Sequence, residues 1–365
     1  MMKIHDLTAT FEREAEILDA SDDGIICAVD GRGEQGNICS LYHIPPQAGK
    51  TQKLLTLPGT RIYESFNTYK MCDRWFYAVS VDDQYRVTLK TIDKQDFSIR
   101  KISQILPEKE VLQIFPVDED HLIVVEEGPV SYIWKLSTGR KYDLGKTFGG
   151  LYILDAHLWH AGSSEAFLTI HFTDDKNETV VSAGAAALVD AAIQGQKVRM
   201  KNLAGPAASI ENGGTSSDGI WLHVTEKRND RSLKIYNFDC TGPEPVQSVC
   251  RMITVPEKGT VVKSSIGGHV WQVCEDAEND VVSVKNLSGT AEDFDYPADD
   301  GDFNGCCFDG LALTTRYDTV MFRGEPLFSE VVVIRDLKNN AVRTFKGSYE
   351  VFPGHLVLKK SFLYL

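Results

Sequence analysis

The residues whose types could support catalysis do not form a recognised catalytic motif. A nucleophile elbow, a P-loop, an HExxH pair and a dinucleotide-binding fingerprint are all absent from the sequence. The small-residue run at 213–217 precedes a predicted strand rather than a helix, so we do not expect it to cradle a phosphate. The sequence therefore predicts no catalytic residue and no bound cofactor.

The densest group of potential metal ligands consists of Asp155, His157, His160 and His171. Two of these histidines are three residues apart, a spacing that suits ligands on one face of a helix. The apolar pair 158–159 between them favours a strand or a loop instead. A zinc site needs three or four well-placed ligands. We therefore interpret these residues as structural or surface histidines and predict no metal site.

Charge and cysteine usage limit the classes of partner and the compartment. The chain has 365 residues, of which 52 are acidic and 38 basic, so its net charge is −14. Nucleic acids and anionic membranes both require clustered Lys and Arg, so neither is predicted as a partner. The eight cysteines show no CxxC spacing, and the first eleven residues lack the apolar core of a signal peptide. We expect a cytoplasmic protein with reduced cysteines.

A short apolar strand, introduced by a tight turn containing Asp or Gly, recurs along the whole chain. Its eight copies are centred on residues 27, 78, 124, 170, 222, 272, 314 and 358, which are 42 to 52 residues apart. Self-similarity at such a period is the signature of a repeat architecture. The repeat is the strongest signal in the sequence.

Each repeat unit contains further strands. A second apolar strand, such as 86–92 or 130–136, follows most copies after a short polar turn, and a third, more polar segment such as 140–144 comes next. Together with the segment before each tight turn this gives four strands, which make one propeller blade. We predict an all-β propeller of about eight blades in a single domain, 1–365. Seven blades remain the alternative if two units merge near the Ala-rich segment 183–192, which suits a short helix or a weak strand.

The two ends of the chain suggest how the ring closes. The last unit stops after 361–365, before an outer strand has formed, whereas 2–7 resembles the outer-strand pattern of 140–144. We therefore predict that the N-terminal segment supplies the missing strand of the last blade.

The segment Ile133-Trp134-Lys135-Leu136 resembles the third-strand signature of WD40 repeats, in which Trp and Asp follow an aliphatic residue; 334–337 keeps only the Asp. The Asp-Gly turns at 23–24, 218–219 and 309–310 resemble the turn before the second strand of that family. The Gly-His dipeptides stand elsewhere than in WD40 repeats, so the buried Asp–His–Ser–Trp set of the family is not assigned. The resemblance implies a divergent WD40-like propeller that binds other proteins; kelch and quinoprotein-like propellers remain alternatives.

A propeller enzyme is the competing hypothesis. Lactonases and sugar dehydrogenases of propeller type gather carboxylates around the central channel, often on a calcium ion, so a metal-dependent hydrolase or sugar oxidoreductase stays open. The acidic residues concerned are Asp22, Asp23, Asp118, Glu119, Asp120, Asp299, Asp300 and Asp302. Most occupy the repeated turn, where Asp bonds its own backbone. Trp75, Trp221 and Trp271 recur at one strand position, which favours packing between blades.

One departure from the repeat carries a functional prediction. The turn 317–328 is far longer than its counterparts and holds apolar residues where other units hold charge. Long apolar loops in a compact repeat are commonly functional, although this one could instead fold over its own blade. We predict a protein-binding surface made by Met321, Phe322, Arg323, Leu327 and Phe328. The predicted function is an intracellular interaction scaffold.

Overall fold

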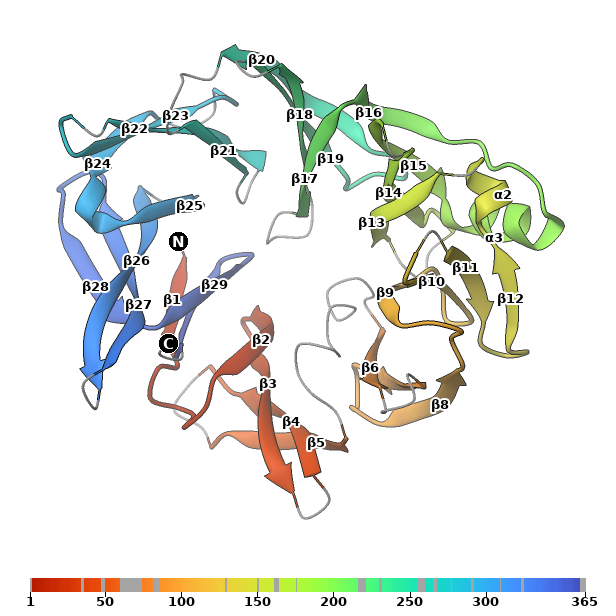
Figure 1. Cartoon of the computed structure of the whole chain (residues 1–365). Helices are drawn as coiled ribbons and strands as arrows, with labels where there is room; N and C mark the ends of the chain where they lie inside the picture. The colour runs from red at the N-terminus through yellow and green to blue at the C-terminus, as the bar shows by residue number, and fades with distance from the viewer. Residues whose placement is uncertain are drawn as a thin grey trace.

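The computed structural model arranges the strands as eight separate sheets in a ring (Figure 1). The structure describes residues 2–33, 36–46, 50–59, 74–81, 86–128, 130–149, 151–160, 164–174, 176–215, 221–229, 232–254, 260–264, 268–276, 278–289, 292–308, 310–322 and 325–361. We number the sheets as blades in chain order from the first complete one.

Blades 1 to 4 occupy the first half of the chain. Blade 1 contains β2 (Ala15–Ser21), β3 (Gly24–Gly33), β4 (Gly36–Ile44) and β5 (Gln52–Pro58), and blade 2 contains β6 (Trp75–Val81), β7 (Val87–Asp93) and β8 (Ile99–Ile105). Blade 3 contains β9 (Val111–Pro116), β10 (His121–Glu126), β11 (Val130–Lys135) and β12 (Arg140–Asp143). Blade 4 contains β13 (Tyr152–Trp159), β14 (Phe167–Thr173), β15 (Glu178–Gly184) and β16 (Lys201–Ala207).

Blades 5 to 8 complete the ring. Blade 5 contains β17 (Ser209–Thr215), β18 (Trp221–Asn229), β19 (Ser232–Asp239) and β20 (Val246–Thr254), and blade 6 contains β21 (Thr260–Ser264), β22 (Val270–Asp276), β23 (Val281–Asn286) and β24 (Phe294–Pro297). Blade 7 contains β25 (Asp302–Phe308), β26 (Leu311–Phe322), β27 (Glu325–Asp336) and β28 (Val342–Lys346). Blade 8 contains β29 (Ser348–Phe352), β30 (His355–Lys359) and the N-terminal β1 (Lys3–Asp6).

The predicted all-β propeller is confirmed as an architecture, and the blade count is eight rather than seven. Each of the eight repeat centres lies in a different blade, in β3, β6, β10, β14, β18, β22, β26 or β30. The Ala-rich segment, for which the sequence left helix and strand open, forms α3 (Ala185–Gln194), which follows β15 directly. Within the described ranges the other short helices are α2 (Gly145–Phe148) and the 3-10 turn η2 (Ala298–Asp300).

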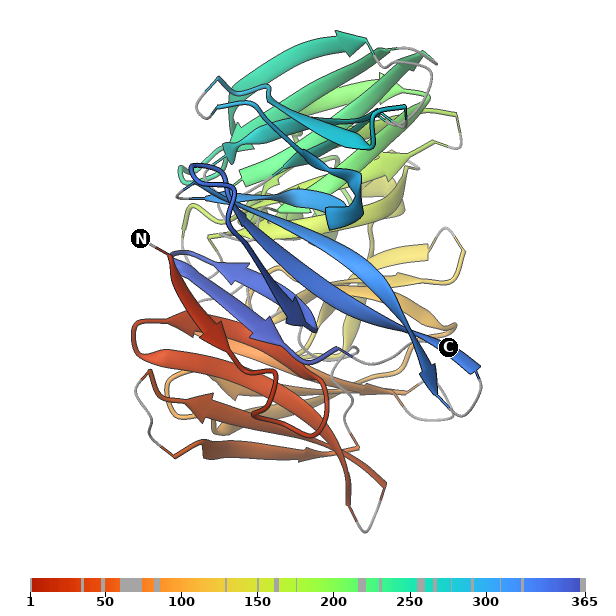
Figure 2. The ribbon, with the colours of Figure 1, turned by 90° about the vertical axis from the view of Figure 1, so that its left-hand side faces the viewer.

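The N-terminal strand closes the ring, as the sequence predicts. β1 pairs with β30 from Lys3↔His355 to Asp6↔Leu358, and Figure 2 shows it beside the strands of the last blade. One detail differs from the prediction, because β1 takes the third place in the sheet and runs parallel to β30. An N-terminal segment that arrives from outside the blade has no hairpin connection to β30, and hence no need to run antiparallel to it.

Each blade buries its apolar residues against its neighbours, as expected of a repeat whose units cannot fold alone. One buried cluster joins Ile17, Cys27 and other blade 1 residues to Phe352 and Val357 of blade 8. Another places Trp271 of blade 6 beside Phe303 of blade 7. Burial raises the pKa of the Cys27 and Cys39 thiols to about 12, so these cysteines behave as small apolar side chains. Among the described residues, no helix is both long and apolar enough to cross a membrane.

Candidate interaction surface

The hairpin of β26 and β27 extends beyond the rest of blade 7. Pairing of β25 with β26 reaches Thr315, and pairing of β28 with β27 begins at Val331. Beyond these positions β26 and β27 continue to pair with each other as far as Phe322↔Glu325. The described residues from 316 to 330 therefore form a two-stranded ribbon that projects from the sheet.

The expected long turn at 317–328 is thus wrong as a description of the backbone. Polar and apolar residues do not alternate through Tyr317-Asp318-Thr319-Val320, so periodicity gives no strand signal here. The aromatic and β-branched residues of this segment are the signal that favours a strand. Two extended strands also satisfy each other's backbone groups, which a loop of this length would have to leave to water.

One side of the ribbon exposes three large apolar side chains, beside Thr319 and Glu330. In an antiparallel pair, directly opposite residues point to the same face, so Thr319↔Phe328 and Met321↔Pro326 share a face with Tyr317. The exposed fractions are 58% for Tyr317, 65% for Met321 and 44% for Phe328. We call these three residues the ribbon face.

The structure separates the five residues that the sequence grouped. Met321 and Phe328 lie together on the ribbon face, whereas Leu327 points to the opposite face and is 8% exposed. Phe322 lies in β26 opposite Glu325, and Arg323 lies outside the described residues. Tyr317 belongs to the ribbon face and was not among the predicted contact residues. The sequence left two alternatives for this segment, an exposed contact surface and a loop folded over its own blade. Each describes one side of the ribbon, because the ribbon face is exposed and Leu327 is covered.

Polar contacts with η2 hold the base of the ribbon. The hydroxyl of Thr314 donates to the carbonyl of Asp300 at 2.6 Å, and Arg335 Nε donates to the Asp300 carboxylate at 3.0 Å. The side chains of Asp300 and Arg335 are each 13% exposed, so solvent screens their ion pair less than it screens a pair at the surface. Arg316 adds a bond from Nε to the Asp318 carboxylate at 3.1 Å. These contacts fix the ribbon base on a rigid part of the blade.

Other acidic residues named from the sequence also have structural partners. The Asp118 carboxylate accepts the backbone N–H groups of Asp120 at 2.7 Å and His121 at 2.9 Å, as a turn residue does. Asp120 in turn accepts both the N–H and the hydroxyl of Ser137 at 2.6 Å. These two carboxylates are used inside blade 3.

The histidines of blade 4 diverge rather than converge. His160 Nε2 donates to the carbonyls of Cys240 at 2.8 Å and Gly242 at 2.9 Å, which ties blade 4 to blade 5. His171 Nε2 lies 3.1 Å from the Glu178 carboxylate. The ring of His157 packs on Trp159, and burial lowers its pKa to about 4. The described part of the chain contains no group of three or more His, Cys, Asp or Glu residues placed to hold a metal ion.

The recurring tryptophans pack between blades, as expected. Trp221 of blade 5 lies against Gly268, just before β22 of blade 6, so close that a Cβ on Gly268 would stand 2.7 Å from the indole ring. Trp271 of blade 6 is fully buried and meets Phe303 of blade 7 edge to face, with ring centroids 5.8 Å apart. Such aromatic pairs add to the burial of apolar area.

No protein-family model matches the sequence, and no curated protein matches it either. Similar solved structures include an uncharacterized protein of Listeria monocytogenes (9% identity, 97% of this chain and 98% of that chain, TM-score 0.48). The propeller domain of the Trilobed protease of Pyrococcus furiosus has 11% identity over 91% of this chain and 98% of that chain, with a TM-score of 0.42. The propeller domain of Swd1 from Myceliophteria thermophila has 9% identity over 92% and 96%, with a TM-score of 0.37. Sequence identities and TM-scores this low support no statement about the activity of this chain.

Proposed function

We propose that this chain is a cytoplasmic protein-interaction scaffold, a single propeller domain of residues 1–365, that binds a partner protein on the ribbon face. The observation that carries the proposal is the exposure of Tyr317, Met321 and Phe328 side by side on a projecting ribbon. Contiguous apolar surface of this kind is typical of interaction sites. Cys27, Cys39 and Cys240 are buried and free of disulfides, which suits the cytoplasm.

The ribbon suits a binding role for two physical reasons. Aromatic residues and methionine are enriched at interfaces, because they bury much area for few rotatable bonds. The base is held by the bonds of Asp300 to Thr314 and Arg335, so little conformational entropy remains to be lost on binding. Burying one such side chain contributes about 2 kcal/mol, which corresponds to roughly a 30-fold change in affinity.

The test compares co-purified proteins between variants. Tagged wild-type protein, Met321→Asp and Phe328→Asp are purified from the native cells, and Ile102→Asp serves as the control because Ile102 is 62% exposed on β8 of blade 2. We expect at least one protein whose recovery falls roughly 30-fold in both ribbon variants and is unchanged in the control. That protein, once purified, should bind the wild type directly and the ribbon variants more weakly by the same factor.

Equal recovery of every co-purified protein from wild type and both ribbon variants would refute the proposal. Melting temperatures within about 2 °C of the wild type would show that the variants are folded, because these substitutions lie at exposed positions.

A further inference from the structure

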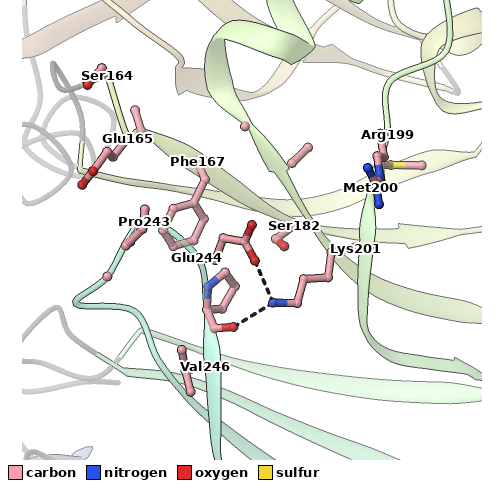
Figure 3. A pocket seen from close by; sticks show the side chains of 15 residues that line it. Ser164, Glu165, Phe167, Ser182, Arg199, Met200, Lys201, Pro243, Glu244 and Val246 are labelled. Carbon is pink, nitrogen blue, oxygen red and sulfur yellow. Dashed lines mark hydrogen bonds and ion pairs between the residues drawn. The ribbon is translucent and has the colours of Figure 1, made fainter.

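A pocket of about 900 Å³ lies where blades 4 and 5 meet, and the proposed function does not use it. Its walls come from the ends of β14 and β15, from the segment that leads into β16, and from residues 242–246 at the start of β20 (Figure 3). The volume is in the range of small-molecule sites and is far more than a bare ion needs. The two carbonyl bonds of His160 to Cys240 and Gly242 hold the blade 5 wall in place.

Hydrogen-bond donors without partners face this space. Ser182 is 6% exposed, and its hydroxyl points into the pocket (Figure 3). Within the part of the chain that the structure describes, nothing bonds to that hydroxyl. The oxygen is not fully enclosed, so an acceptor on a ligand replaces the water that would otherwise solvate this hydroxyl.

Helix α3 begins at the same wall. Its N-cap residue, Gly184, lines the pocket and offers no side-chain cap, and the first turn holds no acidic residue. The N–H of Ala185 already donates to the carbonyl of Ala166 at 2.9 Å, and the other N–H groups of the first helical turn have no acceptor within the helix. The N-terminal end of the helix also carries a partial positive charge.

The charged residues of the pocket favour an anion over a cation. Lys201 Nζ lies 3.0 Å from the Glu244 carboxylate and 3.4 Å from the carbonyl of Pro245, so the charge of Glu244 is already balanced. Glu165 also has an interaction of its own. Arg199 lines the pocket, and we find no ionic partner for it among the described residues. Among these described residues Arg199 is therefore free of an ionic partner, whereas the two carboxylates and Lys201 are engaged.

We propose that this pocket binds a phosphate monoester with an apolar or aromatic ester group. The Ser182 hydroxyl and the α3 N-terminus lie together at the junction of β15 and α3, and Arg199 comes from the segment that leads into β16, an arrangement that suits the several acceptor oxygens of a phosphate. Phe167, Met200 and Val246 line the remaining wall and would contact the ester group. The inference is independent of the ribbon face, which lies in another blade.

The test is calorimetric titration with phenyl phosphate, inorganic phosphate and benzoate. We expect phenyl phosphate to bind more tightly than either of the other two. Arg199→Ala and Ser182→Ala should each weaken its binding at least about tenfold, the effect of one hydrogen bond to a charged group. Arg343→Ala, at an exposed arginine on β28, is the matched control and should leave binding unchanged.

Glu244→Gln distinguishes the sign of the ligand's charge. Removing this carboxylate releases Lys201, so phenyl phosphate should bind several times more tightly. Weaker binding in Glu244→Gln, unchanged binding in Arg199→Ala, or no binding of phenyl phosphate at about 10 mM would overturn the proposal. Benzoate binding as tightly as phenyl phosphate would refute the phosphate assignment, and inorganic phosphate doing so would refute the role of the apolar wall.

Discussion

Deletion of residues 1–10 should open the ring at a defined seam. β1 is held to blade 8 by backbone bonds that include Lys3 N–H to the Gly354 carbonyl at 2.9 Å and Leu7 N–H to the Leu358 carbonyl at 2.8 Å. His5 Nε2 and His355 Nδ1 share a further bond at 2.9 Å. Leu7 is 8% exposed in the cluster that joins blades 1 and 8.

These contacts set the size of the effect. About four backbone hydrogen bonds contribute roughly 1 kcal/mol each, and burial of Leu7 contributes about 2 kcal/mol, so the deletion should cost about 6 kcal/mol. Unfolding entropy of about 2.1 cal/mol/K per residue over 365 residues converts this into a melting temperature lower by about 8 °C.

Differential scanning calorimetry of the wild type, the deletion and two point variants measures this. Leu7→Ala keeps the strand and should lower the melting temperature by about 4 °C, whereas Ile4→Ala, at a residue 36% exposed, should change it by less than about 2 °C. A deletion variant that melts within about 2 °C of the wild type would show that β1 does not close the ring.

Two further predictions concern packing and pH. Gly268→Ala should lower the melting temperature by several degrees, because φ is +73° and the new Cβ would stand 2.7 Å from Trp221. Gly289→Ala controls for backbone strain, because this glycine has the same φ of +73° but nothing lies within 4 Å of the added Cβ. Equal losses of melting temperature in both variants would refute the role of the Trp221 contact. Burial lowers the pKa of His223 to about 4, so the unfolded chain takes up a proton at about pH 6.5 while the folded chain does not. The contribution of His223 to the free energy of unfolding should be constant above pH 6.5 and should fall by about 3 kcal/mol as the pH drops to about 4. Urea unfolding of wild type and His223→Gln between pH 7 and about pH 4.5 checks this, and parallel curves would contradict it.

The sequence predicts the ring well because each blade repeats one buried strand. The centres at Cys27, Val124 and Ile170 lie in strands buried on both sides, where only apolar residues fit. The apolar strands therefore remain recognisable at a regular spacing even though the sequences around them differ from unit to unit. The N-terminal closure was predicted from the same logic, since a unit without its outer strand needs one.

The candidate sites were harder to predict. The length of the insertion at 317–328 indicated a special feature, but its residues do not alternate between polar and apolar, so a loop was expected and Tyr317 was not assigned to a strand face. The pocket could not be predicted, because Ser182 and Glu244 come from different blades and are brought together only by the way those blades pack. No local pattern in the sequence records such a juxtaposition.

The claim that the ribbon face contacts a partner protein is tested most directly by photo-crosslinking in the native cells. A photoreactive phenylalanine analogue replaces Met321, Phe328 or, as the control, Ile102, all of which are exposed. We expect the same crosslinked partner from positions 321 and 328 and none of it from position 102. The absence of any crosslink from both ribbon positions, or the same products from position 102, would contradict the proposed function.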